Sequence, residues 1–185
     1  MRLTGGGSIF DKIKSDDLIM AFFPCIRFEN QILLHFRGDV SQFKNKTIEE
    51  KLLYDMELQK ELTHNYMLIT KLVLVCLKKN IPLIIENPYS TQHYLHTHWA
   101  LKPQVIDMNR RLRGDNFIKP TQYFFVNCEP KNNFIFEPQV IKELKISNEL
   151  RTVERSMISK EYANRFIREF ILDGTPKEET KLSLF

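Results

Sequence analysis

Cysteine is scarce in this chain, and close pairs of cysteines are missing. The three cysteines, Cys25, Cys76 and Cys128, stand about fifty residues apart. This spacing excludes a disulfide-stapled scaffold and a CxxC-type zinc site. The chain also lacks the ~18 consecutive apolar residues of a membrane-spanning helix, and it has no apolar signal core near Met1. We therefore expect a protein without a membrane anchor that is located in the cytoplasm.

An excess of one charge is missing as well. Lys and Arg number 27 and Asp and Glu 23, which gives a net charge of +4. This balance permits an anionic partner without requiring one. With 185 residues, of which 43% are hydrophobic, the chain has the size and composition of one packed domain. We predict a flexible lead-in over 1–15, a domain over 16–172 and a charged tail over 173–185.

The first half of the chain has the pattern of a strand, a long helix and a second strand. Residues 17–23 and 81–85 are continuous apolar runs, which are typical of strands covered on both faces in parallel α/β sheets. Thr47 is a good helix N-cap, and the apolar periodicity after it predicts a helix to Lys79. From Met67 to Leu77 the apolar residues spread around the helix, so we expect that end to be buried. The whole segment predicts a right-handed βαβ unit.

The rest of the chain has the pattern of loops, a third strand and a last helix. Residues 29–46 and 89–99 are polar and predict loops, and 121–127 predicts a third strand. Ser159 predicts the cap of a last helix with Tyr162, Phe166, Ile167 and Phe170 on one face. Three histidines lie in the second loop, His93, His96 and His98. No cysteine or carboxylate cluster completes a ligand set, so we predict no metal site.

Residues suited to chemistry follow both apolar strands. Pro24-Cys25 follows the first strand and Glu86-Asn87-Pro88 the second. Ligands of open parallel sheets bind outside the carboxyl ends of the strands, so Cys25 and Glu86 are expected to face one crevice. A thiolate beside a carboxylic acid suits covalent attack with proton donation. Taken singly, Cys25 also fits a small buried hydrophobe and Glu86 an exposed loop acid.

Four short segments together carry a family resemblance. They are Phe23-Pro24-Cys25-Ile26-Arg27-Phe28, Ile85-Glu86-Asn87-Pro88, Lys119-Pro120-Thr121 and Arg155-Ser-Met-Ile. In this order and spacing, the chain resembles cytosine-5 DNA methyltransferases, and most of all their divergent phage and prophage members. The resemblance covers roughly residues 16–172. It implies an α/β fold, a partial class I methyltransferase-like (Rossmann-like) parallel sheet with flanking helices.

The resemblance also implies roles for individual residues. Cys25 is the expected nucleophile toward carbon 6 of cytosine, and Glu86 is expected to hold and protonate nitrogen 3, with Asn87 as a further catalytic residue. The target base must be flipped out of the DNA duplex. The methyl donor of the family is S-adenosylmethionine. The expected substrate-binding residues are Pro24, Phe28, Pro88, Lys119, Thr121 and the arginines Arg110, Arg111 and Arg113.

The chain departs from the family pattern in two places. Phe23 and Ile26 replace the usual Pro and Gln around the Pro-Cys pair. Gly5-Gly6-Gly7 is the only glycine-rich stretch near the start, and four residues cannot form the strand that a cofactor loop follows. We therefore expect the C-terminal portion of such an enzyme, largely without its own cofactor site. The open sheet edge predicts self-association or a second chain that completes the sheet.

An alternative function needs no catalysis. A basic turn contains Arg110, Arg111 and Arg113. Its composition is equally typical of a phosphate-binding site and of a solvated cluster of charges. A non-catalytic remnant of the same fold would bind DNA or protein through this turn, without a cofactor.

Overall fold

The structure is a computed structural model, and it describes residues 9–14, 17–23, 27–29, 32–135 and 157–173. The chain divides into two compact units. The first unit comprises Met1–Met108 with Pro120–Glu129, and the second comprises Asn109–Lys119 with Pro130–Phe185. Each unit is described by itself. In the described part of the chain, no helix is both long and apolar enough to cross a membrane.

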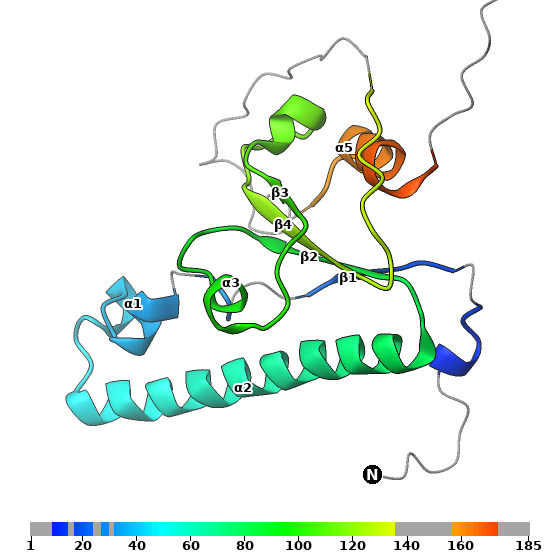
Figure 1. Cartoon of the computed structure of the whole chain (residues 1–185). Coiled ribbons are helices and arrows are strands. Elements are labelled where there is room, and N and C mark those ends of the chain that lie inside the picture. Colours follow the sequence, from blue (N-terminus) through cyan, green and yellow to red (C-terminus); the bar gives the residue numbers. More distant parts are fainter. Residues whose placement is uncertain (1–8, 15–16, 24–26, 30–31, 136–156, 174–185) are drawn as a thin grey trace, which may run out of the picture. The chain divides into compact units, whose positions relative to one another are not determined.

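The first unit is built on a four-stranded sheet with the order β1-β2-β4-β3. The strands are β1 (Ile19–Phe22), β2 (Leu83–Pro88), β3 (Val105–Asp107) and β4 (Thr121–Val126). β1 pairs in parallel with β2, and the long helix α2 (Ile48–Lys79) connects them (Figure 1). The predicted βαβ unit is therefore confirmed. Among the described strands β1 has only one neighbour, so it forms an open edge.

The sheet is mixed, whereas we had predicted a parallel sheet. β4 pairs antiparallel with both β2 and β3. Apolar runs report the burial of a strand and not its direction, which depends on the connection that precedes it. A parallel neighbour needs a long crossover, and α2 supplies one between β1 and β2. Only the short helix α3 (Tyr94–His98) and β3 fall between β2 and β4 in this unit.

Local sequence signals fix both ends of α2. The Thr47 hydroxyl accepts a hydrogen bond from the Glu50 backbone N–H, and the Glu50 carboxylate accepts one from the Thr47 N–H, which forms a capping box. At the other end, Asn80 adopts the left-handed conformation, with φ of 53°. The predicted start and end of the helix are thus confirmed.

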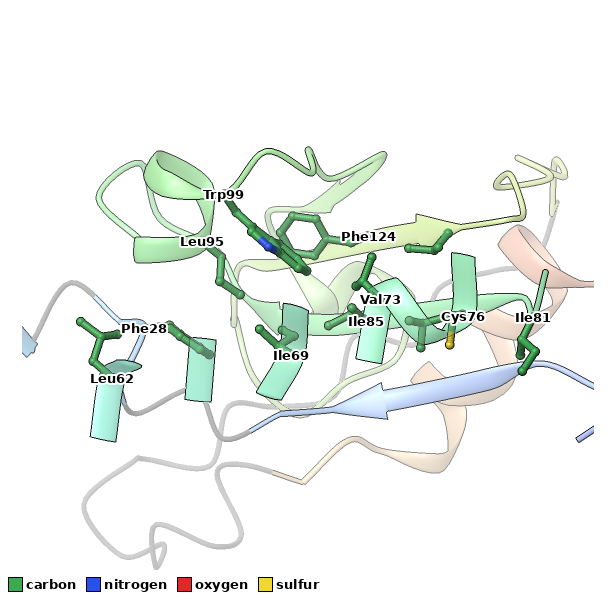
Figure 2. Close-up of a cluster of buried hydrophobic side chains, with 12 residues drawn as sticks. Phe28, Leu62, Ile69, Val73, Cys76, Ile81, Ile85, Leu95, Trp99 and Phe124 are labelled. Carbon is green, nitrogen blue, oxygen red and sulfur yellow. The ribbon is translucent and has the colours of Figure 1, made fainter. Parts of the chain in front are cut away.

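One face of α2 packs on the sheet, and the helix is not buried all round as predicted. Leu58, Leu62, Ile69, Val73 and Cys76 are its buried residues. They belong largely to a hydrophobic core with Ile85, Phe124, Leu95 and Trp99 (Figure 2). The residues that stay exposed near its C-terminal end are Met67, Leu68, Leu74 and Leu77, at 49–59%. The all-round prediction fails because the sheet covers only one side of the helix.

Short helices replace parts of the predicted loops. α1 (Ile32–Phe36) and the 3₁₀ turn η2 (Ser41–Phe43) lie within 29–46, and α3 lies within 89–99. Another 3₁₀ turn, η1 (Ile9–Asp11), lies within the predicted flexible lead-in, where Phe10 and Ile13 pack against the core. These helices have three to five residues, too few for the apolar repeat by which helices are recognised in a sequence.

The second unit combines the basic turn with the last helix. It contains the 3₁₀ turn η3 (Arg110–Arg113), the helix α5 (Lys160–Phe166) and the π-helical turn η4 (Ile167–Ile171). The Ser159 hydroxyl accepts from the Tyr162 backbone N–H, as expected of an N-cap. Tyr162, Phe166 and Phe170 are buried as predicted, whereas Ile167 is exposed. At 100° per residue, Ile167 lies about 140° around the helix from Tyr162, outside the narrow arc of Tyr162, Phe166 and Phe170.

Candidate active site at the ends of β1 and β2

The register of the parallel pair places the end of β1 opposite the predicted catalytic residue Glu86. Phe22, the last residue of β1, lies directly opposite Glu86 of β2. Pro24-Cys25 follows Phe22 after one residue, and Asn87-Pro88 follows Glu86. The expectation that the two strands are neighbours is therefore confirmed, whereas β2 continues to Pro88, so Glu86-Asn87-Pro88 belong to the strand and do not follow it. Pro24 and Cys25 themselves lie outside the described residues.

Glu86 and Asn87 point to opposite faces of the sheet, because successive strand residues alternate. Asn87 shares a face with Leu83 and Ile85, which pack in the core beside α2. Glu86 lies on the other face, opposite Tyr123 of β4. Both are buried, Glu86 with 8% of its surface exposed and Asn87 with none. Glu86 is therefore not an exposed loop acid but a buried residue inside β2, two residues before its end.

Phe28 anchors the chain shortly after Cys25. Its side chain is fully buried, and its ring lies near those of His93 and Tyr94, with centroid distances of 6.2 and 6.3 Å. Its carbonyl accepts a hydrogen bond of 2.8 Å from the Tyr94 N–H. Phe28 therefore ties the segment that follows Cys25 to the start of α3. In this position it supports the site through packing.

His93, a buried histidine that we did not predict as a functional residue, is linked to the end of β2 through Gln122. The Gln122 amide nitrogen donates to the Pro88 carbonyl at 2.8 Å and to His93 Nδ1 at 3.1 Å. Burial, and then the nearby His96, lower the pKa of His93 to about 4. His93 is therefore neutral near pH 7, and because Nδ1 accepts, Nε2 carries the proton. Only a histidine-rich loop marked this position in the sequence.

Two of the predicted substrate-binding residues, Pro88 and Thr121, lie opposite each other in the sheet. They are cross-strand partners at the ends of β2 and β4. The Tyr89 backbone N–H donates to the Pro120 carbonyl at 2.8 Å, which extends the pairing beyond the sheet. Lys119, which we also predicted to bind substrate, belongs to the second unit. The end of β2 is thus held to β4 and to Pro120 by backbone and side-chain hydrogen bonds.

Several buried polar atoms near the end of β2 have no hydrogen-bond partner among the described residues. Asn87 donates from Nδ2 to the Glu86 carbonyl at 2.9 Å. Asn87 Oδ1, Gln122 Oε1 and His93 Nε2 are buried and have no hydrogen-bond partner among the described residues. The cluster therefore offers two acceptors and one donor. Buried polar groups are normally satisfied, so these atoms are suited to binding a small hydrogen-bonding group or a water molecule.

The predicted arginines take part in bonds within the second unit. Arg110 is buried, forms an ion pair with the equally buried Asp115, and lies 4.7 Å from the centre of the Tyr162 ring. Arg113 donates twice to the Glu169 carboxylate, at 3.0 and 2.9 Å. Both arginines therefore have a structural role within the second unit. A phosphate group that bound either one would compete with its carboxylate partner. Arg111 is partly exposed.

The two described cysteines contrast with the predicted nucleophile. Cys76 is a core residue of α2, and burial raises the pKa of its thiol, which makes it a poor nucleophile. Cys128 is half-buried, and its sulfur contacts the Val126 carbonyl at 3.4 Å.

No protein-family model, curated protein or solved structure matches this chain. The described residues contain no group of three His, Cys, Asp or Glu side chains suited to a metal ion. Among the same residues, no strand followed by a glycine-rich turn and a helix precedes β1.

Proposed function

We propose that this chain is the base-handling portion of a cytosine-5 DNA methyltransferase-like protein. Cys25 is the nucleophile toward cytosine and Glu86 is the acid, whereas Asn87, on the opposite face of β2, donates to the Glu86 carbonyl and acts as a positioning residue. The observation that carries this proposal is the parallel register in which Phe22 lies opposite Glu86. It supports a site in which the residues after β1 and the end of β2 act on one base.

The strand order adds support at the level of the fold. In class I methyltransferase-like sheets, the last strand of the chain inserts antiparallel between two strands that are parallel to each other. β4 has this relation to β2 and β3. The open edge at β1 is the side on which such a sheet continues toward its cofactor-binding half. A partner that supplies those strands would bring S-adenosylmethionine to the site.

The chemistry assigned to this chain is a reversible addition to a flipped cytosine. The Cys25 thiolate bonds to carbon 6, the double bond shifts to carbons 4 and 5, and nitrogen 3 takes the proton of Glu86. Carbon 5 is then nucleophilic, and in the absence of a methyl donor it accepts a proton from water. The hydroxide left by that water removes the original carbon-5 proton, and the Glu86 carboxylate then takes the proton back from nitrogen 3 as the thiolate leaves carbon 6, which restores cytosine and both catalytic groups.

This cycle exchanges the carbon-5 hydrogen with solvent and requires no cofactor. The test incubates the full chain with mixed-sequence duplex DNA in D₂O, followed by digestion and mass spectrometry of the nucleosides. We expect deuterium in deoxycytidine with the wild-type chain and none with Cys25→Ser. Cys128→Ser is the matched control and should exchange at the wild-type rate. Equal exchange by wild type and Cys25→Ser, or none by a folded wild type that binds DNA, would refute the proposal.

A further inference from the structure

An apolar stripe runs along the solvent side of α2, away from the core residues of that helix. Its members lie within about 100° of arc at 3.6 residues per turn. Together with the polar Gln59 and Thr63 at its middle, the stripe extends over nearly the whole helix. Its apolar members are half or more exposed, at 49–73%: Ile48, Leu52, Met56, Met67, Leu74 and Leu77. Figure 1 shows the sheet along one side of α2.

The two halves of α2 carry opposite charge. Residues 48–63 contain five acidic and two basic side chains, whereas 64–79 contain three lysines and no acidic residue. Each half therefore complements the other half and repels itself. Within the described residues, Glu49, Lys71 and Lys78 form no ion pair, so these charges are free to meet a partner. A parallel neighbour with the same sequence would be repelled, and an antiparallel one attracted.

The stripe is nearly symmetric about its centre. When the helix is reversed about Thr63, Leu52 falls opposite Leu74, and Ile48 falls within one residue of Leu77. The same reversal brings Glu49 beside Lys78 and Glu57 near Lys71. A surface that matches its own reversed copy in both apolar positions and charge is the requirement of a two-fold interface.

We propose that α2 is the interface of a homodimer, in which the helices of two copies pack antiparallel through this stripe. The partner is a second copy of this chain because the complementary charges are both present on one helix. The stripe extends along a helix of 32 residues, or about 48 Å at 1.5 Å per residue. Burial of the apolar stripe stabilises the pair, and the charges set its direction. The interface uses α2 and leaves the edge of β1 open.

The first test measures the mass of the full chain by sedimentation equilibrium from about 1 to 100 μM, a range that covers common dimer affinities. We expect a dimer that dissociates on dilution and weakens as salt rises. Leu52→Glu with Leu74→Glu places like charges together and should raise the dissociation constant roughly tenfold or more. Met108→Glu with Ile118→Glu changes two exposed apolar residues outside α2 and serves as the control, with wild-type affinity expected. Circular dichroism verifies that each variant is folded.

A charge-reversal pair tests the direction of packing. Glu49→Lys with Glu57→Lys makes one variant basic along α2, and Lys71→Glu with Lys78→Glu makes the other acidic. Each variant alone should be monomeric, and a 1:1 mixture should form heterodimers. A wild-type chain that stays monomeric would overturn the proposal, as would a Leu52→Glu/Leu74→Glu variant that dimerises normally. Variants that self-associate as well as wild type would overturn the antiparallel arrangement.

Discussion

The protonation of His93 should control the acid stability of the first unit. Its ring is buried, its Nδ1 accepts from Gln122, and its pKa is lowered to about 4 from the ordinary value of 6.5. In the unfolded chain the ring takes up a proton near its ordinary pKa. Between pH 6.5 and 4 the unfolded state therefore binds more protons, and unfolding becomes easier as the pH falls.

The size of the effect follows from the two pKa values. The free energy of unfolding should be unaffected by His93 above about pH 7 and should decrease progressively toward pH 4. Linkage gives a loss of about 2 kcal/mol by about pH 5 and roughly 3 kcal/mol when both states are protonated. Protonation of His93 Nδ1 would also place an N–H donor against the Gln122 amide nitrogen, which is itself a donor. The amide would then reorient, and its hydrogen bond to the Pro88 carbonyl would weaken.

Urea unfolding at a series of pH values measures this contribution. His93→Gln has no titrating ring, so its stability should fall less between pH 7 and 5 than that of the wild type, by about 2 kcal/mol. His64→Gln, at an exposed position of α2, is the control and should keep the wild-type slope. If His93→Gln and the wild type lose the same stability over this range, His93 is not buried as a neutral ring and the account of the site is wrong.

Two further predictions concern stability. Asp115→Ala removes the buried carboxylate that pairs with Arg110, so the free energy of unfolding should fall by about 3–5 kcal/mol; a loss below about 1 kcal/mol in urea unfolding would contradict the burial of this pair. Thr47→Ala removes one side of the capping box of α2 and should cost about 1 kcal/mol, whereas Thr47→Ser should cost much less. Equal thermal unfolding midpoints for the two Thr47 variants would contradict this role of the hydroxyl.

The sequence predicted the elements that depend on local chemistry. The N-cap of α2 at Thr47, its end at Asn80, and the strands β1, β2 and β4 all follow from caps, apolar runs and breakers. The relation of β1 to β2 was also predictable, because one long helix separates them and crossover connections favour parallel neighbours.

Features that depend on distant contacts were not predictable. The direction of β4 is set by its pairing with β2 and β3, and its own residues do not encode it. The exposed side of α2 was predicted as buried because Met67, Leu74 and Leu77 are apolar, and sequence alone does not reveal what covers them. The role of His93 arises from Gln122, which is 29 residues away. Glu86 was found through its place after an apolar run, but its burial depends on the sheet around it.

The direct test of the central claim, that Glu86 acts with Cys25 on one cytosine, is the rate of carbon-5 hydrogen exchange in Glu86→Gln. Removal of a general acid typically costs about 10²–10⁴-fold in rate, so we predict a loss of this order with DNA affinity preserved. Glu129→Gln, at an exposed position of the first unit, should exchange at the wild-type rate. Wild-type exchange by Glu86→Gln would contradict the claim that the end of β2 supplies the proton.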